Sequence, residues 1–125
     1  MTENDLSKRF LDIAFKVHTA LGPGLLESAY ENIICYELEK NNIPFQRQID
    51  VPIHYDGQKF SNAFRADLIL DNKVIIELKS VECMNDVHKK QLLTYLKLTG
   101  LKLGLLINLN EKHLKDGIIR IANNL

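Results

Sequence analysis

The sequence predicts a single α/β domain over residues 1–125, with elements in the order α-α-β-β-β-α-β-α. Apolar residues recur at helical spacing through the N-terminal third, and the period changes to two at Phe45. Strand-like and helix-like segments then alternate to the end of the chain. With 125 residues, the chain is long enough to bury one hydrophobic core of ordinary size.

The N-terminal part is predicted to form two helices. Apolar side chains between Phe10 and Leu21 recur every three or four residues, which predicts a helix over residues 4–21 that ends at Gly22. Pro23 and Gly24 then break the chain. A second amphipathic helix is expected over residues 25–41.

The remaining elements alternate between strands and helices. An Asp56-Gly57 turn joins predicted strands over residues 45–55 and 58–70, which is typical of a hairpin. The apolar and β-branched segment 73–81 predicts a third strand that is covered on both faces. A helix over 86–99, a fourth strand over 102–109 and a final helix over 111–123 complete the order. The helix between them should place the fourth strand parallel to the third.

Composition excludes several classes of protein. Sixteen basic and sixteen acidic residues cancel, so no overall positive field indicates a nucleic-acid or membrane partner, and any nucleic-acid contact should be local. The N-terminus has no basic stretch followed by an apolar run, which predicts a cytoplasmic protein without a membrane partner. Cys35 and Cys83 are too few and too far apart for a disulfide framework, and both are expected to be buried thiols.

Three charged residues on the second and third predicted strands carry the strongest chemical signal. Asp67 lies in RADLIL, and Glu77 and Lys79 lie in IIELKS with one residue between them, so strand alternation puts Glu77 and Lys79 on one face. Two carboxylates can share a hard cation such as Mg²⁺, and a neighbouring Lys can orient or help deprotonate a water. This arrangement suits hydrolysis of a phosphodiester.

A shared metal ion also requires a particular hairpin register. A two-residue loop at 71 and 72 would pair Asp67 with Ile76 and leave the two carboxylates on opposite faces. We therefore predict a three-residue loop at 70–72, with Asn72 left-handed and a bulge, which pairs Asp67 with Ile75 and restores a common face. The alternative is a solvated strand pair with an ordinary ion pair. Charges within an otherwise buried strand favour the functional interpretation.

Several motifs resemble those of a known family. GLLESAY at residues 24–30 is similar to the motif of the GxxExxY proteins, a group assigned to the PD-(D/E)XK nuclease superfamily. RAD at 65–67, ELK at 77–79 and QLLTYL at 91–96 stand where the other motifs of that family are expected, and Ala66 replaces the Pro of the superfamily's name. The resemblance implies a restriction-endonuclease-like core, with a mixed four-stranded sheet flanked by helices, and a Mg²⁺-dependent nuclease fold.

The resemblance also implies roles for individual residues. Asp67 and Glu77 would be metal ligands, Lys79 would position the attacking water, and Glu27 would complete the metal shell from its helix. The alternative for Glu27 is that an acid in the first helical turn is favoured by the macrodipole and needs no metal.

Gln91 and Tyr95 share one helical face, with His88 one turn earlier. They resemble the QxxxY signature of RecB-like and lambda-exonuclease-like members, in which the pair supports the site and contacts the nucleic-acid backbone. The alternative is that Tyr95 packs on the sheet while Gln91 caps its edge. His18 is expected to be structural, with the metal site as its alternative.

Basic residues of the second half of the chain are candidate phosphate contacts, with a solvated helix face as the alternative. Arg65 is the preferred cation, because it lies two residues before Asp67 on the same predicted strand face. The others are Lys89, Lys90, Lys97, Lys102, Lys112, Lys115 and Arg120.

The leading hypothesis is a metal-dependent nuclease that hydrolyses phosphodiester bonds of DNA or RNA through a metal-activated water. DNA is favoured over RNA, and Mg²⁺ over Mn²⁺. The competing hypothesis is a catalytically silent module of the same fold that binds nucleic acid or a protein partner. A structural dimerisation domain is a third class, but it leaves the Asp, Glu and Lys set unexplained. A homodimer is expected only because so small a domain often needs a second copy to grip a duplex.

Overall fold

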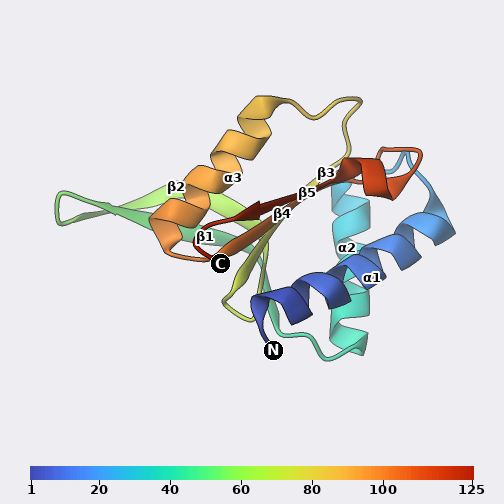
Figure 1. Ribbon diagram of the computed structural model, residues 1–125, viewed down its shortest axis with the longest axis horizontal. Helices are drawn as coiled ribbons and strands as arrows, with labels where there is room; N and C mark the ends of the chain where they lie inside the picture. The colour runs from blue at the N-terminus through green and yellow to red at the C-terminus, as the bar shows by residue number, and fades with distance from the viewer.

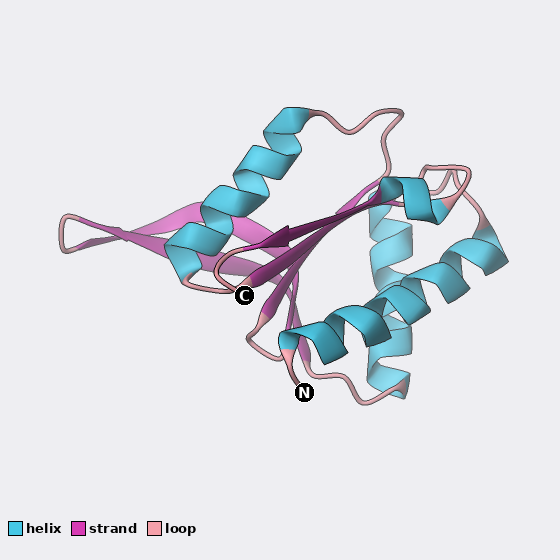
Figure 2. Ribbon diagram, viewed as in Figure 1, coloured by secondary structure: helices cyan, strands magenta, loops and turns pink.

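The computed structural model describes residues 1–125 as three layers, with a five-stranded sheet between helices (Figures 1 and 2). The strand order is β1-β2-β3-β4-β5; β3 and β4 run parallel and every other neighbouring pair is antiparallel. None of the helices is both long and apolar enough to cross a membrane. The elements are α1 (Glu3–Leu21), α2 (Glu27–Lys40), β1 (Phe45–Tyr55), β2 (Gln58–Leu70), β3 (Val74–Lys79), α3 (Asp86–Thr99), β4 (Leu103–Asn108), the 3-10 helix η1 (Leu114–Gly117) and β5 (Ile118–Ala122).

The predicted order is confirmed as far as β4, and the prediction for the C-terminus is wrong. Instead of a helix over residues 111–123, the chain forms η1 and then β5, which pairs antiparallel with β4 and adds a fifth strand. The segment is rich in β-branched residues that suit a pleated surface. Ile118 packs on the side of α1 and α2, whereas Ile119 and Ile121 pack on the side of α3. As a strand, this segment packs apolar side chains against both clusters, whereas an amphipathic helix would bury only one face.

The sheet carries a separate hydrophobic cluster on each face. Helices α1 and α2 cover one face, where Phe10, Tyr30 and Leu38 contact side chains of β2, β3 and β4. Helix α3 covers the other face through Leu92 and Leu96. Burial of these faces supplies the main driving force for folding, and the strands β3 and β4 are sandwiched between the two clusters.

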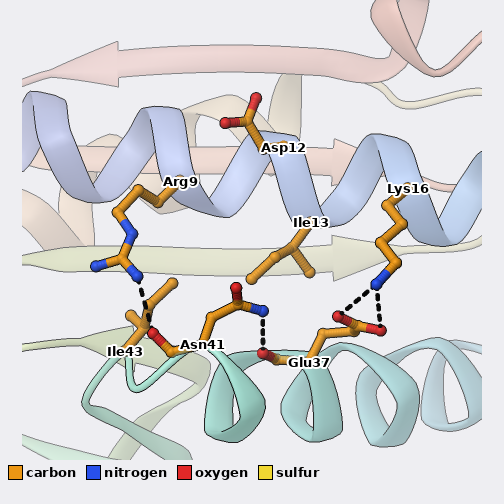
Figure 3. Close-up of a pocket in the computed structure, with 7 residues that line it drawn as sticks. All are labelled: Arg9, Asp12, Ile13, Lys16, Glu37, Asn41 and Ile43. Atoms are coloured by element: carbon orange, nitrogen blue, oxygen red, sulfur yellow. Dashed lines mark hydrogen bonds and ion pairs between the residues drawn. The ribbon is translucent and has the colours of Figure 1, made fainter.

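Helices α1 and α2 are also joined by polar contacts on their outer side (Figure 3). Lys16 forms an ion pair with Glu37 at 3.1 Å, and Arg9 donates a hydrogen bond to the carbonyl of Asn41 at 2.8 Å. Ile13 lies between them in a cavity of about 210 Å³. The charged groups of this cavity are therefore satisfied by the protein itself.

The hairpin of β1 and β2 extends as an arm beyond the rest of the sheet (Figure 1). Along β2, Ala66 packs with the α3-side cluster, but Leu68 packs with the cluster of α1 and α2. Two residues that should share a face thus lie on opposite faces. Gln48, which lies opposite Asp67 in the β1–β2 register, has a left-handed backbone with φ 47°. The regular alternation of side chains along β2 is therefore interrupted at Asp67.

The cysteines only partly match the expectation. Cys35 is buried, and burial raises the pKa of its thiol to about 11. Cys83 is exposed, so the prediction of two buried thiols is wrong for this residue. It follows the end of β3, in the connection to α3, where the chain runs over the surface.

Gly104 allows α3 to lie close to β4. A Cβ atom at this position would lie 2.9 Å from two side-chain carbons of Leu92. We expect Gly104→Ala to destabilise the protein by about 1–3 kcal/mol through overpacking, measured by urea denaturation. In a double-mutant cycle, Gly104→Ala combined with Leu92→Ala should cost less than the sum of the single variants. Additive costs would show that contact with Leu92 is not the cause.

Candidate active site

The site forms where β2 separates from β3. Pairing between these strands runs from Leu70–Val74 to Leu68–Ile76 and stops there. Strand β3 continues beside β4 as far as Lys79, whereas β2 continues beside β1 into the arm. The next backbone N–H groups along both strands therefore lose their ladder partners, and a buried N–H without a partner is costly.

Two carboxylates take the place of the missing ladder. Glu77 Oε2 accepts a hydrogen bond from the backbone N–H of Asp67 at 3.3 Å, and Asp67 Oδ2 accepts one from the N–H of Leu78 at 2.8 Å. Each strand thus holds the acidic side chain of the other. This reciprocal arrangement fixes both carboxylates between the diverging strands.

The register achieves the common face that the sequence analysis required, but through a different loop. The loop comprises three residues, 71–73, instead of 70–72, and Leu70 pairs with Val74. Asn72 is left-handed as predicted, with φ 54°, and Asp71 is left-handed too, with φ 47°. Continuing this register places Asp67 opposite Glu77. The predicted partner, Ile75, pairs with Ile69 instead. The predicted and observed registers differ by two residues, which is the side-chain period of a strand, so both put the two carboxylates on the same face.

Electrostatically, the pair lacks positive charge. Burial, and after it the neighbouring Asp67 carboxylate, raise the pKa of Glu77 to about 8, while Lys79 opposes the shift only weakly. Lys79 lies two residues beyond Glu77 at the end of β3 and forms no ion pair within 4.0 Å. A cation placed against the two acids would offset this repulsion.

A cavity of about 380 Å³ opens beside Asp67. Its walls include Glu27 and Ser28 at the start of α2, together with Glu31, Gln48 and Leu78. The structure thus brings Glu27, which is exposed, to the same cavity as Asp67. No three His, Cys, Asp or Glu residues lie close enough together to form a complete protein metal site. Asp67 and Glu77 are the two acids that the reciprocal backbone hydrogen bonds hold together at this position.

Three residues of this region were missed by the sequence analysis. Glu31 is buried and accepts hydrogen bonds from Arg47 at 2.8 Å and from Gln48 at 2.6 Å. Gln48 Nε2 also lies 3.4 Å from Asp67 Oδ1. Glu31 follows Glu27 by one helical turn, which was a usable signal. No sequence signal indicated the left-handed conformation of Gln48, because the residue is neither Gly nor Asn.

The motif at residues 24–30 has a structural explanation in the loop before α2. Gly24 has φ 104°, a conformation that favours glycine. The Tyr30 hydroxyl donates to the carbonyl of Gly22 at 2.6 Å and accepts from the N–H of Leu25 at 3.2 Å. Ser80 donates to the carbonyl of Leu25 at 2.6 Å, which ties the loop to the end of β3. The loop therefore places Glu27 in the wall of the cavity that Asp67 also lines.

Helix α3 contributes less contact to the site than the resemblance implies. The ring of Tyr95 stacks on Phe64, with centroids 3.7 Å apart and planes inclined by 7°. Burial and then the charge of Glu77 raise the pKa of the Tyr95 hydroxyl. Gln91 is exposed and forms no hydrogen bond within the protein, and His88 Nδ1 is buried without a partner. Tyr95 thus packs on the sheet at the edge of the site.

The remaining candidates lie apart from the carboxylates or have other partners. Arg65 is exposed and lies opposite Asp50 in the register; the change of face after Ala66 removes the alternation that related it to Asp67. Lys89 pairs with Asp86 at 3.8 Å on the same helix.

Two further side chains hold distant segments of the chain together. Arg120 on β5 donates to the Asn4 side chain at 2.6 Å. His18 is buried, and its Nε2 forms a 2.7 Å hydrogen bond with the carbonyl of Glu111. This contact gives His18 a structural role, because it joins α1 to the segment before η1.

Comparison with known proteins agrees with the fold. A family model described as "PD-(D/E)XK nuclease superfamily" matches residues 4–121, which is nearly the whole chain. The chain belongs to the PD-(D/E)XK nuclease superfamily. No curated protein and no solved structure matched the chain significantly.

The anchoring role of Tyr30 can be tested by removing its hydroxyl. Tyr30→Phe should leave the carbonyl of Gly22 and the N–H of Leu25 without their partner. We expect a loss of about 1–2 kcal/mol in the free energy of unfolding, and faster hydrogen exchange at Leu25. Tyr36→Phe is the matched control on the same helix, because Tyr36 is 62% exposed. Equal effects of the two substitutions would contradict the anchoring role.

The pH dependence of stability tests the environment of Glu77. Its pKa is about 8 when folded against 4.5 for the free group, so the folded metal-free protein holds the proton more tightly. This contribution to stability is fully present below about pH 4.5 and is lost as the pH rises to about 8. Glu77→Gln, which stays neutral, should therefore gain stability relative to wild type over this range, by about 1 kcal/mol or more.

Urea denaturation in EDTA at pH 5 and pH 9 measures this difference. Glu82→Gln, at an exposed position after β3, is the control and should follow the wild type at both pH values. A Glu77→Gln curve parallel to that of the wild type would contradict the unbalanced carboxylate pair.

Proposed function

We propose that this protein is a metal-dependent nuclease that hydrolyses phosphodiester bonds of nucleic acid, with DNA as the favoured substrate. The observation that carries the proposal is the reciprocal carboxylate pair of Asp67 and Glu77, held by each other's strand and lacking a compensating cation. Membership of the nuclease superfamily supports it independently. The enzymes of this superfamily generally use divalent metal ions.

The donor set fits a small hard cation. Mg²⁺ is usually held by one or two carboxylates and keeps its other positions for water and substrate phosphates. Two protein carboxylates, without a third acidic ligand nearby, match this requirement. Asp67 and Glu77 would hold the ion, and Glu27 would face it across the cavity. When bound, Mg²⁺ supplies Lewis-acid stabilisation of the charge that develops on the phosphate.

The protein's own groups then have distinct tasks. Asp67 and Glu77 are fixed by backbone N–H groups, so little reorganisation is needed to present their oxygens. Lys79 has no partner within the protein and is free to orient the attacking water or to contact the phosphate. Gln48 and Glu31 restrain the opposite side of Asp67.

A second function is consistent with the same fold. A catalytically silent module would bind nucleic acid or a protein without cleaving it. The carboxylate pair would then serve only to satisfy two backbone N–H groups at the strand divergence. That role does not require Lys79, whose unpaired charge at the same position favours catalysis.

Cleavage assays distinguish the two functions. Wild-type protein with Mg²⁺ should cleave single- or double-stranded DNA or RNA, and EDTA should abolish the activity. Asp67→Asn and Lys79→Ala should each lower the rate by about 100-fold or more, because each removes a group that acts in the transition state. Asp50→Asn on β1 and Lys73→Ala in the hairpin loop are charge-matched controls and should keep wild-type rates.

The outcomes separate clearly. Equal activity of Lys79→Ala and Lys73→Ala would contradict the role given to Lys79. Salt-sensitive binding without any cleavage by the wild type, in either Mg²⁺ or Mn²⁺, would favour the silent module.

A further inference from the structure

The largest cavity in the protein lies outside the carboxylate site. It has a volume of about 450 Å³ and runs between the C-terminal end of α1 and the segment that leads into η1, on the side of the molecule where β3 ends (Figure 1). Lys112, His113 and Lys115 line one wall, and Phe15 and His18 line the other. We call this cavity the basic groove.

The charges of the basic groove are unbalanced. No carboxylate side chain is among its lining residues, and neither Lys112 nor Lys115 forms an ion pair or a side-chain hydrogen bond. The cavity between α1 and α2 is different, because there Lys16 is paired with Glu37 (Figure 3). The lysines of the basic groove thus remain available for an external anion.

The groove is also held in shape. The buried imidazole of His18 forms its 2.7 Å hydrogen bond with the carbonyl of Glu111, the residue directly before Lys112. This bond fastens the lysine-bearing segment to α1. Phe15 on the facing wall is 41% exposed, so an apolar ring lies beside the cations. Cations next to an accessible aromatic ring are the combination that binds single-stranded nucleic acid, through phosphates and a stacked base.

The loop before α2 connects residues that line the groove to residues that line the carboxylate cavity. Gly22 and Pro23 line the groove, while Glu27 and Ser28 line the carboxylate cavity, so only three residues of the loop separate them. The bond from Ser80 to the carbonyl of Leu25 fixes this loop beside the end of β3. A strand bound at the carboxylates therefore has to cross only this loop to enter the basic groove.

We propose that the basic groove binds the backbone phosphates of a single nucleic-acid strand that extends from the carboxylate site, with Phe15 stacking on one of its bases. This inference rests on the proposed nuclease function for the identity of the ligand. Lys112 and Lys115 are the phosphate contacts. Arg120, another basic residue of the C-terminal half, differs from these two lysines because its guanidinium has a partner within the protein.

Binding can be measured without cleavage. Fluorescence anisotropy in EDTA follows a short fluorescein-labelled single-stranded DNA, with RNA and duplex DNA of the same sequence for comparison. The double variant Lys112→Ala/Lys115→Ala should bind the single strand about 10-fold more weakly, and the slope of log K against log salt should become shallower by about 1.4, because two phosphate contacts are lost. Phe15→Ala should weaken single-strand binding by about 5-fold or more and duplex binding less.

The matched control is Lys40→Ala/Lys73→Ala, which removes the same charge at the end of α2 and in the loop before β3. It should change affinity by less than about 2-fold. Thermal denaturation of each variant checks that the substitutions leave the fold intact. Equal weakening by both double variants, or an absence of nucleic-acid binding by the wild type, would overturn the proposal.

Failure of this inference and failure of the nuclease proposal give different results. If wild type cleaves DNA with Mg²⁺ while the Lys112/Lys115 variant binds and cleaves normally, the groove proposal is wrong and the nuclease proposal stands. If binding depends on the groove lysines but no cleavage occurs, the groove proposal stands and the protein is a binding module.

Discussion

The exchange of hydrogen bonds between two carboxylates and two backbone amides, at the point where β2 leaves β3, is the constraint on which the site depends. A sheet whose inner strands diverge exposes unpaired N–H groups in its interior, and Asp67 and Glu77 satisfy them. Apolar residues at these positions would leave both donors without partners, at about 1–3 kcal/mol each. The architecture therefore requires a hydrogen-bond acceptor at each position, and the proposed metal chemistry requires that both acceptors be acids. Their burial also produces the repulsion that favours a cation between them.

The acidic residues around the cavity differ in whether a cation of the protein compensates their negative charge. Glu31 is buried, but Arg47 and Gln48 occupy both of its oxygens, and its charge is compensated within the protein. Asp67 and Glu77 have amide donors but no guanidinium or ammonium group in direct contact. Gln48 connects the two sets by reaching both Glu31 and Asp67. Glu27 also has no ion pair, but it is exposed to solvent, so Asp67 and Glu77 are the acids at this cavity whose charge is neither paired nor fully solvated.

The sequence predicted those features that depend on local periodicity and turn chemistry. Both N-terminal helices, the hairpin and the left-handed Asn72 followed from patterns within a few residues, and the parallel β3–β4 pair followed from the helix that connects the two strands. The failures occurred where distant contacts decide. Segment 118–122 becomes a strand because β4 offers it an edge. Gln48 adopts a left-handed backbone, which costs about 1–3 kcal/mol, because Glu31 and Asp67 hold its side chain. Neither Glu31 nor Gln48 could be assigned to the site before the register of β1 and the position of α2 were known.

The motif around Glu27 and Tyr30 illustrates how one short segment can organise two surfaces. The loop from Gly22 to Leu26 is closed on one side by the Tyr30 hydroxyl and on the other by Ser80 at the end of β3. Glu27 therefore owes its position to bonds that involve other residues of the motif, and not to a contact of its own carboxylate. Because the same loop forms a wall of the basic groove, any change in its path would move both Glu27, in the wall of the carboxylate cavity, and the edge of the groove. The spacing of Gly24, Glu27 and Tyr30 thus sets the path of the loop that connects the two cavities.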